Sequence, residues 1–248
     1  MLTMLLPPGL DQWMALALIA LSFVTSLVTA TFSLGGGTLM IAVLALVFPP
    51  AVVVPLHGCV QLGSNVGRTL VQREHIQWRL IGWIPLGAVA GTLAGGQFAR
   101  YLPEHLFTIA IAAFVLITTW LPQPKTMGQS PAMQVAAGAI ISALSMVVGA
   151  TGALMATLIR GLPDRRELVA THATLMTIQN GLKVLTFSAI GFAFGAYLPL
   201  VTAMVLFGFA GTALGSRLLV RVPEAVFRLG FKLVLTAVAL DLIRQAVF

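Results

Sequence analysis

The sequence predicts an all-α integral membrane protein built from two homologous halves. Hydrophobic residues make up 58% of the 248 residues, and charged residues make up only 8%. Soluble domains usually carry roughly 25% charged residues, so this chain could not cover a surface that faces water. A bilayer accepts such an exterior because lipid tails are apolar, and we therefore expect membrane lipid to surround the protein.

Long apolar stretches define the expected helices. A spanning helix needs roughly 20 residues, and eight stretches have about this length or more: 12–48, 51–71, 80–98, 104–121, 132–160, 167–190, 196–216 and 226–247. The first and the fifth are too long for one span. Glycines interrupt both, at 35–37 in the first and at Gly149 and Gly152 in the fifth. We expect each half to be a glycine-broken helix or re-entrant hairpin followed by three transmembrane helices.

Glycine and polar residues of the first half are matched by the same or a similar residue 115 positions later in the second half. The matched pairs are Gly37 and Gly152, His57 and His172, Asn65 and Asn180, and Arg68 and Lys183. Polar pairs at one offset inside apolar stretches indicate a duplication, the usual build of secondary transporters. We expect residues 1–122 to form the first membrane repeat, 132–248 the second, and 123–131 the connecting loop.

The basic residues favour an inverted relation between the repeats. If each broken stretch returns to its own side, nine basic residues share one face of the membrane and two share the other; eight simple crossings give seven against four. The nine are Arg73, Arg79, Lys125, Arg160, Arg165, Arg166, Arg217, Arg221 and Arg228, and the two are Arg100 and Arg244. Lys and Arg concentrate on the cytoplasmic side, which favours the hairpins. Three crossings per half then invert the second repeat.

Charge and cysteine content exclude other classes of protein. The net charge is +7, but the 14 Lys and Arg are strung singly between apolar stretches. They form no basic face that could track phosphates, so we expect no nucleic-acid partner. The single cysteine, Cys59, excludes an intrachain disulfide and a cysteine-based metal centre. We expect neither a metal ion nor a cofactor.

Two polar stripes are the candidate substrate site. His57, Gln61, Asn65 and Arg68 share one face of the second stretch. The sixth stretch repeats the pattern with His172, Met176, Asn180 and Lys183, flanked by Thr171 and Gln179. Polar groups inside a span are costly and usually face a bundle interior or a water-filled pathway. Helices that restart at Gly36, Gly37 and Gly152 add free N–H groups. Neither stripe contains Asp or Glu, and a set of donors with fixed positive charge suits a small oxyanion.

Other interpretations of these residues stay open. Arg68 lies close to the loop at Gln72 and is open to snorkelling. The histidines and asparagines are open to a role in helix packing. An intramembrane enzyme with His57 and His172 as metal ligands lacks a nearby carboxylate or third imidazole, and we expect no catalytic residue. An anion channel is harder to separate from a carrier, although repeats with broken helices favour the carrier.

Several motifs together resemble the TauE/SafE family of sulfite exporters. They are the glycine run with its following residues, 35–39, the segment Val169-Ala170-Thr171 before a polar helix, and the Gly-x-x-x-Gly pairs that begin at Gly91 and Gly211. The resemblance implies a multi-pass secondary transporter of the bacterial inner membrane. Its substrate would be a small inorganic or organosulfur oxyanion such as sulfite, an organosulfonate or thiosulfate. Proton coupling and a homodimer are both left open by the resemblance.

The two histidines are the natural place for a link to protons. An imidazole titrates near pH 6.5, and a bound anion favours its charged form. We therefore expect His57 and His172 to link anion binding to protonation, one from each half.

Overall fold

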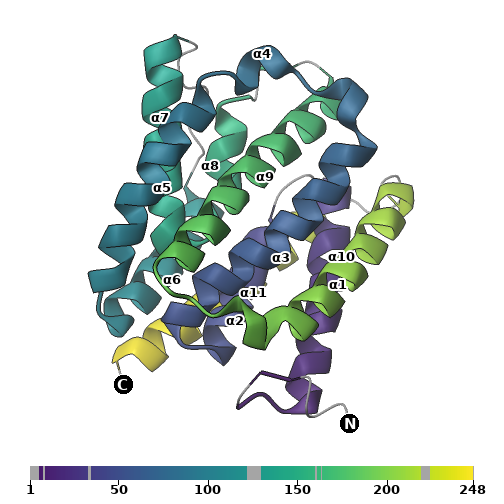
Figure 1. The fold of residues 1–248 in the computed structure, drawn as a ribbon. Coiled ribbons are helices and arrows are strands. Elements are labelled where there is room, and N and C mark those ends of the chain that lie inside the picture. The colour runs from purple at the N-terminus through teal and green to yellow at the C-terminus, as the bar shows by residue number, and fades with distance from the viewer. Residues whose placement is uncertain are drawn as a thin grey trace.

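The computed structural model describes residues 6–7, 9–32, 35–121, 130–159, 161–162, 164–218 and 224–247, and these residues form a bundle of helices (Figure 1). The α-helices are α1 (Gln12–Phe32), α2 (Gly36–Val47), α3 (Pro50–Val71), α4 (Trp78–Ile81), α5 (Ile84–Tyr101), α6 (Glu104–Trp120), α7 (Pro131–Val148), α8 (Gly152–Thr157), α9 (Arg165–Ala189), α10 (Leu198–Leu218) and α11 (Glu224–Val247). Two 3₁₀ turns, η2 (Arg73–His75) and η3 (Phe194–Tyr197), lie between them.

Each of the two longest apolar stretches is divided between two helices at its glycines. The chain leaves α1 and restarts as α2 after Gly35, which has φ 103°, and it leaves α7 at Gly149, which has φ 74°. Positive φ values suit glycine because it has no β-carbon. The sequence places glycine where the backbone must turn back.

Two pairs of helices pack so closely that glycine is required between them. In α5, a β-carbon at Gly87 would collide with the Val135 carbonyl of α7, and one at Gly95 would collide with Ala143. In the same way Gly208 of α10 lies against Ser22 of α1. Contacts advance together along both helices of the α5–α7 pair, so these two helices run parallel. The α1–α10 pair is parallel too. Gly208 lies against Ser22, and Gly215, further along α10, lies against Leu27, which is further along α1.

Hydrogen bonds place the start of α9 at the end of the bundle that carries α4. Gln77, just before α4, donates its backbone N–H to Oγ1 of Thr171 (3.0 Å) and its side-chain amide to Oε1 of Glu167 (2.7 Å). Since α5 starts just after α4 and α7 runs parallel to α5, α7 and α9 begin at the same end. The α8 segment therefore returns the chain to the end from which α7 set out.

The first half shows the same path at the opposite end. Phe48, two residues before α3, packs edge to face on Tyr197, which directly precedes α10, with ring centroids 6.1 Å apart. Because α1 is parallel to α10, α1 and α3 begin at one end and α2 returns the chain. α3 and α9 cross in opposite directions, since Thr69 meets Thr177 (3.2 Å between hydroxyls) whereas Gly58 lies against Lys183.

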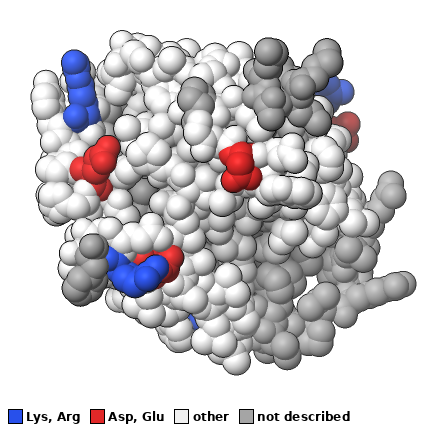
Figure 2. Space-filling view, turned by 90° about the horizontal axis from the view of Figure 1, so that it is seen from below, with Lys and Arg blue, Asp and Glu red and all other residues white. Residues whose placement is uncertain are grey.

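The surface of the bundle is apolar. Among the described residues, three segments are long and apolar enough to cross a membrane: Gln12–Ala30, Pro131–Val148 and Phe194–Gly215. Large apolar side chains stand exposed on several helices, including Trp13, Leu86, Phe98, Ile140, Phe207 and Leu233. Seen from below, the described charged side chains form isolated spots on an uncharged surface (Figure 2). α3 and α9 fall outside the three apolar segments because their polar stripes lower their hydropathy, and these stripes are turned inward.

The described arginines separate between the two ends of the bundle. Arg73, Arg79 and Arg166 lie at or next to α4 and the start of α9, whereas Arg100 and Arg244 lie near the ends of α5 and α11, at the end that holds the C-terminus (Figure 1). Lys125, Arg160, Arg221 and residues 123–129 of the expected connecting loop lie outside the described residues, as do the side chains of Arg165, Arg217 and Arg228.

The α5–α7 contact predicts a clear effect of one methyl group. We expect Gly91→Ala to lower the melting temperature of the detergent-purified protein, because the added carbon would collide with the Ala139 carbonyl and overpacking costs about 1–3 kcal/mol. Gly181→Ala in α9 is the control, since the nearest atom to its new carbon is Cδ1 of Leu62 at 3.9 Å. Equal melting temperatures for the two variants would contradict this packing.

Candidate functional site

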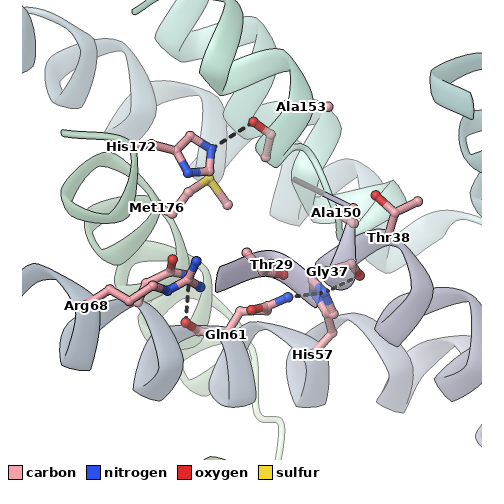
Figure 3. A pocket seen from close by; sticks show the side chains of 13 residues that line it. Thr29, Gly37, Thr38, His57, Gln61, Arg68, Ala150, Ala153, His172 and Met176 are labelled. Carbon is pink, nitrogen blue, oxygen red and sulfur yellow. Dashed lines mark hydrogen bonds between the residues drawn. The ribbon is translucent and has the colours of Figure 1, made fainter. Parts of the chain in front are cut away.

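A cavity of about 50 Å³ lies between α3, α9 and the two glycine breaks (Figure 3). Seven residues of the predicted site line it: Gly37, His57, Gln61, Asn65, Arg68, Gly152 and His172. One water needs about 10–15 Å³ measured in this way, so the cavity has room for a few waters or one small anion. An adjoining pocket shares Arg68 and His172 and reaches Gln72 and Leu168, which places the opening toward the α4 end of the bundle.

The two histidines make the same contact, each within its own half. Nε2 of His57 lies 3.0 Å from the Gly37 carbonyl oxygen, and Nε2 of His172 lies 2.9 Å from the Gly152 carbonyl oxygen. A carbonyl only accepts, so this contact assigns the hydrogen of each ring to Nε2. At His57 the amide nitrogen of Gln61 also lies 3.3 Å from Nε2, a longer contact than the one to Gly37. Each histidine thus fixes the first turn of the helix that restarts after the glycine break. Nδ1 of His57 is buried and has no partner among the described residues.

The asparagines repeat a second contact. Asn65 donates its amide to the Gln61 carbonyl (2.7 Å), and Asn180 donates its amide to the Met176 carbonyl (2.9 Å), each one turn earlier in its helix. One amide hydrogen of each asparagine is held in this way, and the rest of the amide stays available. Oδ1 of Asn180 is buried without a partner in the described part of the chain.

Arg68 gives the cavity its charge. Its guanidinium lies 3.4 Å from the Ser64 carbonyl and 3.4 Å from the Ser64 hydroxyl, both weak contacts within α3. No carboxylate of the described residues pairs with it; Arg244, by contrast, pairs with Asp241 at 2.7 Å. Figure 3 shows Arg68 on the same open space as Gln61, His172 and Met176. A guanidinium has five donors in a fixed fork, so this side chain can bind an oxyanion through two of them.

Lys183 stands apart from the cavity lining. Its position in the second stripe predicts that it faces the substrate as Arg68 does, but the side chain is completely buried in the crossing of α3 and α9. There its ammonium donates to the carbonyl of Gly149, at 2.7 Å. Lys183 therefore reaches the backbone of the α7–α8 break, whereas Arg68, its counterpart in the first stripe, reaches the cavity.

Four other predicted residues also lie behind the cavity lining. Thr171 accepts a hydrogen bond from Gln77, and Gln179 joins the Thr151 and Ser142 hydroxyls, both at 3.2 Å. Asn180 is fully buried, and Gly36 packs against the backbone of α1. These contacts hold α9 and α2 in place around the cavity.

Six lining residues are absent from the predicted site: Thr29, Gly35, Thr38, Ala150, Ala153 and Met176. Thr29 and Thr38 flank the first glycine run, and a hydroxyl beside a helix break was a signal that the sequence carried. Met176 occupies the position of Gln61 in the second stripe, but as an apolar residue it was not predicted to bind the substrate. The alanines carried no signal, because small apolar residues recur throughout the chain.

Comparison with known proteins identifies the family. The family model described as sulfite exporter TauE/SafE matches residues 18–242, which include both glycine breaks and every residue that lines the cavity. No curated protein and no solved structure matches the chain. By this match over nearly its whole length, the chain belongs to the TauE/SafE family of sulfite exporters.

Proposed function

We propose that this protein is a secondary transporter that carries a small sulfur-containing oxyanion across the bacterial inner membrane. Sulfite, an organosulfonate and thiosulfate are the candidate substrates. The observation that carries the proposal is Arg68, a cation without a carboxylate partner among the described residues, at a small cavity between two broken helices. Family membership supports a transporter rather than an enzyme.

The cavity offers the groups that an oxyanion needs. Arg68 supplies positive charge, and the Gln61 amide and the Thr38 hydroxyl lie on the same lining. The first turn of α2 adds backbone N–H groups beside Gly37, where the helix dipole favours negative charge. A volume of about 50 Å³ favours a compact anion over a long organic acid.

The directions of the helices support an inverted repeat. We propose that residues 1–122 and 132–248 are related in this way, with α1–α2 and α7–α8 as re-entrant hairpins. Support comes from α3 and α9, which are antiparallel, and from the return of each broken pair to the end where it began. In inverted repeats the substrate site lies where the halves meet, and alternating access exchanges their conformations.

Transport by purified protein tests the function. In proteoliposomes we expect uptake of labelled sulfite or thiosulfate that saturates and shows counterflow against unlabelled anion. An anion channel, the second candidate, would show neither. Absence of flux for sulfite, thiosulfate and methanesulfonate alike would overturn the proposed substrate class.

Arg68→Gln should separate charge from hydrogen bonding in the cavity. We expect it to weaken anion binding by about 10- to 100-fold, since a hydrogen bond to a charged group contributes about 1.5–3 kcal/mol. Arg68→Lys should retain part of the affinity, because it keeps the charge and loses the fork. Arg244→Gln is the control, because Arg244 is exposed and paired with Asp241. Unchanged affinity in Arg68→Gln, measured by calorimetry, would remove Arg68 from the site.

Cysteine labelling tests the topology. Single cysteines at Gln129 and Gly161, in a Cys59→Ser background, should both be protected from an impermeant thiol reagent in intact cells. The inverted-hairpin topology puts both positions on the cytoplasmic side, where Lys and Arg concentrate. Labelling of only one of them from outside would favour eight simple crossings.

His172→Gln tests the link between the anion and a proton. Nε2 of His172 donates to the Gly152 carbonyl, so a second proton on Nδ1 would add charge and a donor when the anion binds. Binding should therefore weaken as pH rises from about 5.5 to 8, and the variant should lose much of this dependence. Thiosulfate is the suitable probe because, unlike sulfite, it does not itself take up a proton in this range. An unchanged pH profile in both His57→Gln and His172→Gln would exclude the link.

A further inference from the structure

Lys183 is a buried basic residue whose hydrogen-bonding capacity the fold leaves partly unused. Its side chain is 0% exposed, and its one hydrogen bond among the described residues goes to the Gly149 carbonyl. An ammonium has three donors, so two remain to be satisfied. No described carboxylate pairs with it. An unpaired buried charge is costly and such a group tends to neutralise, so a bound anion would both satisfy the free donors and favour the charged form of Lys183.

Two more buried side chains have unused capacity, one at Gly149 and one beside Lys183 in α9. Nδ1 of His57, a residue that is 1% exposed, has no partner among the described residues, and a β-carbon at Gly149 would lie 3.7 Å from it. Asn180, one helical turn before Lys183, is 0% exposed and its Oδ1 is likewise without a described partner. Lys183 and His57 therefore bring unsatisfied polar groups to the α7–α8 break, and Asn180 adds one in the preceding turn of α9.

This cluster is the counterpart of the open site. At the offset of 115 residues, Lys183 corresponds to Arg68, and His57 corresponds to His172. Because α3 and α9 are antiparallel, Arg68 lies beside His172 on the pocket toward the α4 end, and Lys183 lies beside His57 deeper in the bundle. Each group consists of one basic residue from one half and one histidine from the other half.

One residue explains why the two groups differ in this structure. Gly58 of α3 gives the stem of Lys183 its space, since a β-carbon there would lie 2.8 Å from Cδ of Lys183. The corresponding residue of α9 is Ala173, which carries that carbon. The Lys183 stem can therefore pack into the crossing of α3 and α9, while Arg68 reaches the cavity.

We propose that Lys183 and His57, with Asn180, form a second binding station for the small oxyanion, closed in this structure and open toward the opposite side of the membrane in the other state of the transport cycle. The proposal rests on the proposed function and adds to it. The anion would leave Arg68 and His172 and bind at Lys183 and His57 after the bundle changes state. Lys183 would then release the Gly149 carbonyl, because the anion satisfies its donors.

The side from which each station is reached tests the proposal without a substrate. Arg68→Cys and Lys183→Cys, each in a Cys59→Ser background, are treated with a charged thiol reagent in right-side-out and in inside-out membrane vesicles. We expect Arg68→Cys to react from one side only and Lys183→Cys to react from the other side only. Leu56→Cys is the control for a permanently buried position, because Leu56 is 0% exposed. Reaction of both cysteines from one side, or no reaction of Lys183→Cys from either side, would overturn the second station.

Exchange measurements separate a binding role of Lys183 from a structural one. Lys183→Gln keeps a donor for the Gly149 carbonyl and removes the charge, and we expect anion counterflow to fall at least about tenfold, in keeping with the loss of one charged hydrogen-bond partner. Lys183→Arg keeps the charge and should retain part of the counterflow. Wild-type counterflow in Lys183→Gln would overturn the proposal. So would equal loss in both variants with unchanged melting temperatures, because the charge would then have no role.

The experiments distinguish a failure of the proposed function from a failure of the second station. If the wild-type protein carries no sulfur oxyanion at all, the proposed function fails, and the vesicle labelling still decides whether Lys183 and Arg68 open to opposite sides. If the wild-type protein exchanges the anion while the labelling shows one side only, the function stands and the second station does not.

Discussion

The structure depends on how the polar backbone is satisfied where two helices are broken inside an apolar bundle. In a bilayer an unpaired carbonyl or N–H costs several kcal/mol, so irregular backbone survives only where protein or enclosed water satisfies it. Lys183 does this at the α7–α8 break by binding the Gly149 carbonyl, and His57 and His172 tie the first turns of the two restarted helices to α3 and α9 through the Gly37 and Gly152 carbonyls. All three come from α3 and α9, which is why these two helices carry polar stripes and lie at the centre.

The same contacts position the candidate site. Once each histidine is fixed to the start of the restarted helix, the cavity is enclosed by two helix breaks and two crossing stripes, and Arg68 is the cation left facing it. The close α5–α7 and α1–α10 contacts support this centre from outside, through glycines such as Gly91 and Gly211 whose β-carbons would strike the neighbouring backbone. The first helix of each broken pair, α1 or α7, is therefore held by a closely packed neighbour, α10 or α5.

Much of this could be predicted because polar residues are costly in a membrane and so carry more information than apolar ones. The offset of 115 residues paired His57 with His172 and Gly37 with Gly152, and these are the contacts that the structure repeats. The sequence could not reveal how deeply each polar side chain lies in the bundle. Whether Lys183 faces the cavity or the backbone of Gly149 depends on the crossing of α3 over α9, a contact between residues far apart in the chain. Alanines such as Ala150 could not be predicted either, since nothing distinguishes them from packing residues.

The two halves differ at corresponding positions, and these differences affect how each would bind an anion. A symmetric pair of stations would hold the anion equally well on both sides, and a ligand that binds two states equally shifts neither. Here Gln61 corresponds to Met176, Arg68 to Lys183 and Gly58 to Ala173. The first stripe therefore offers a guanidinium and an amide, and the second offers an ammonium that a backbone carbonyl already engages. The Gly149 carbonyl already holds one of the three donors of Lys183, so under the proposal the anion competes with that hydrogen bond and its affinity at the second station is lowered. Under the proposed cycle the two stations thus differ in affinity, and this difference would favour release on the Lys183 side over rebinding there.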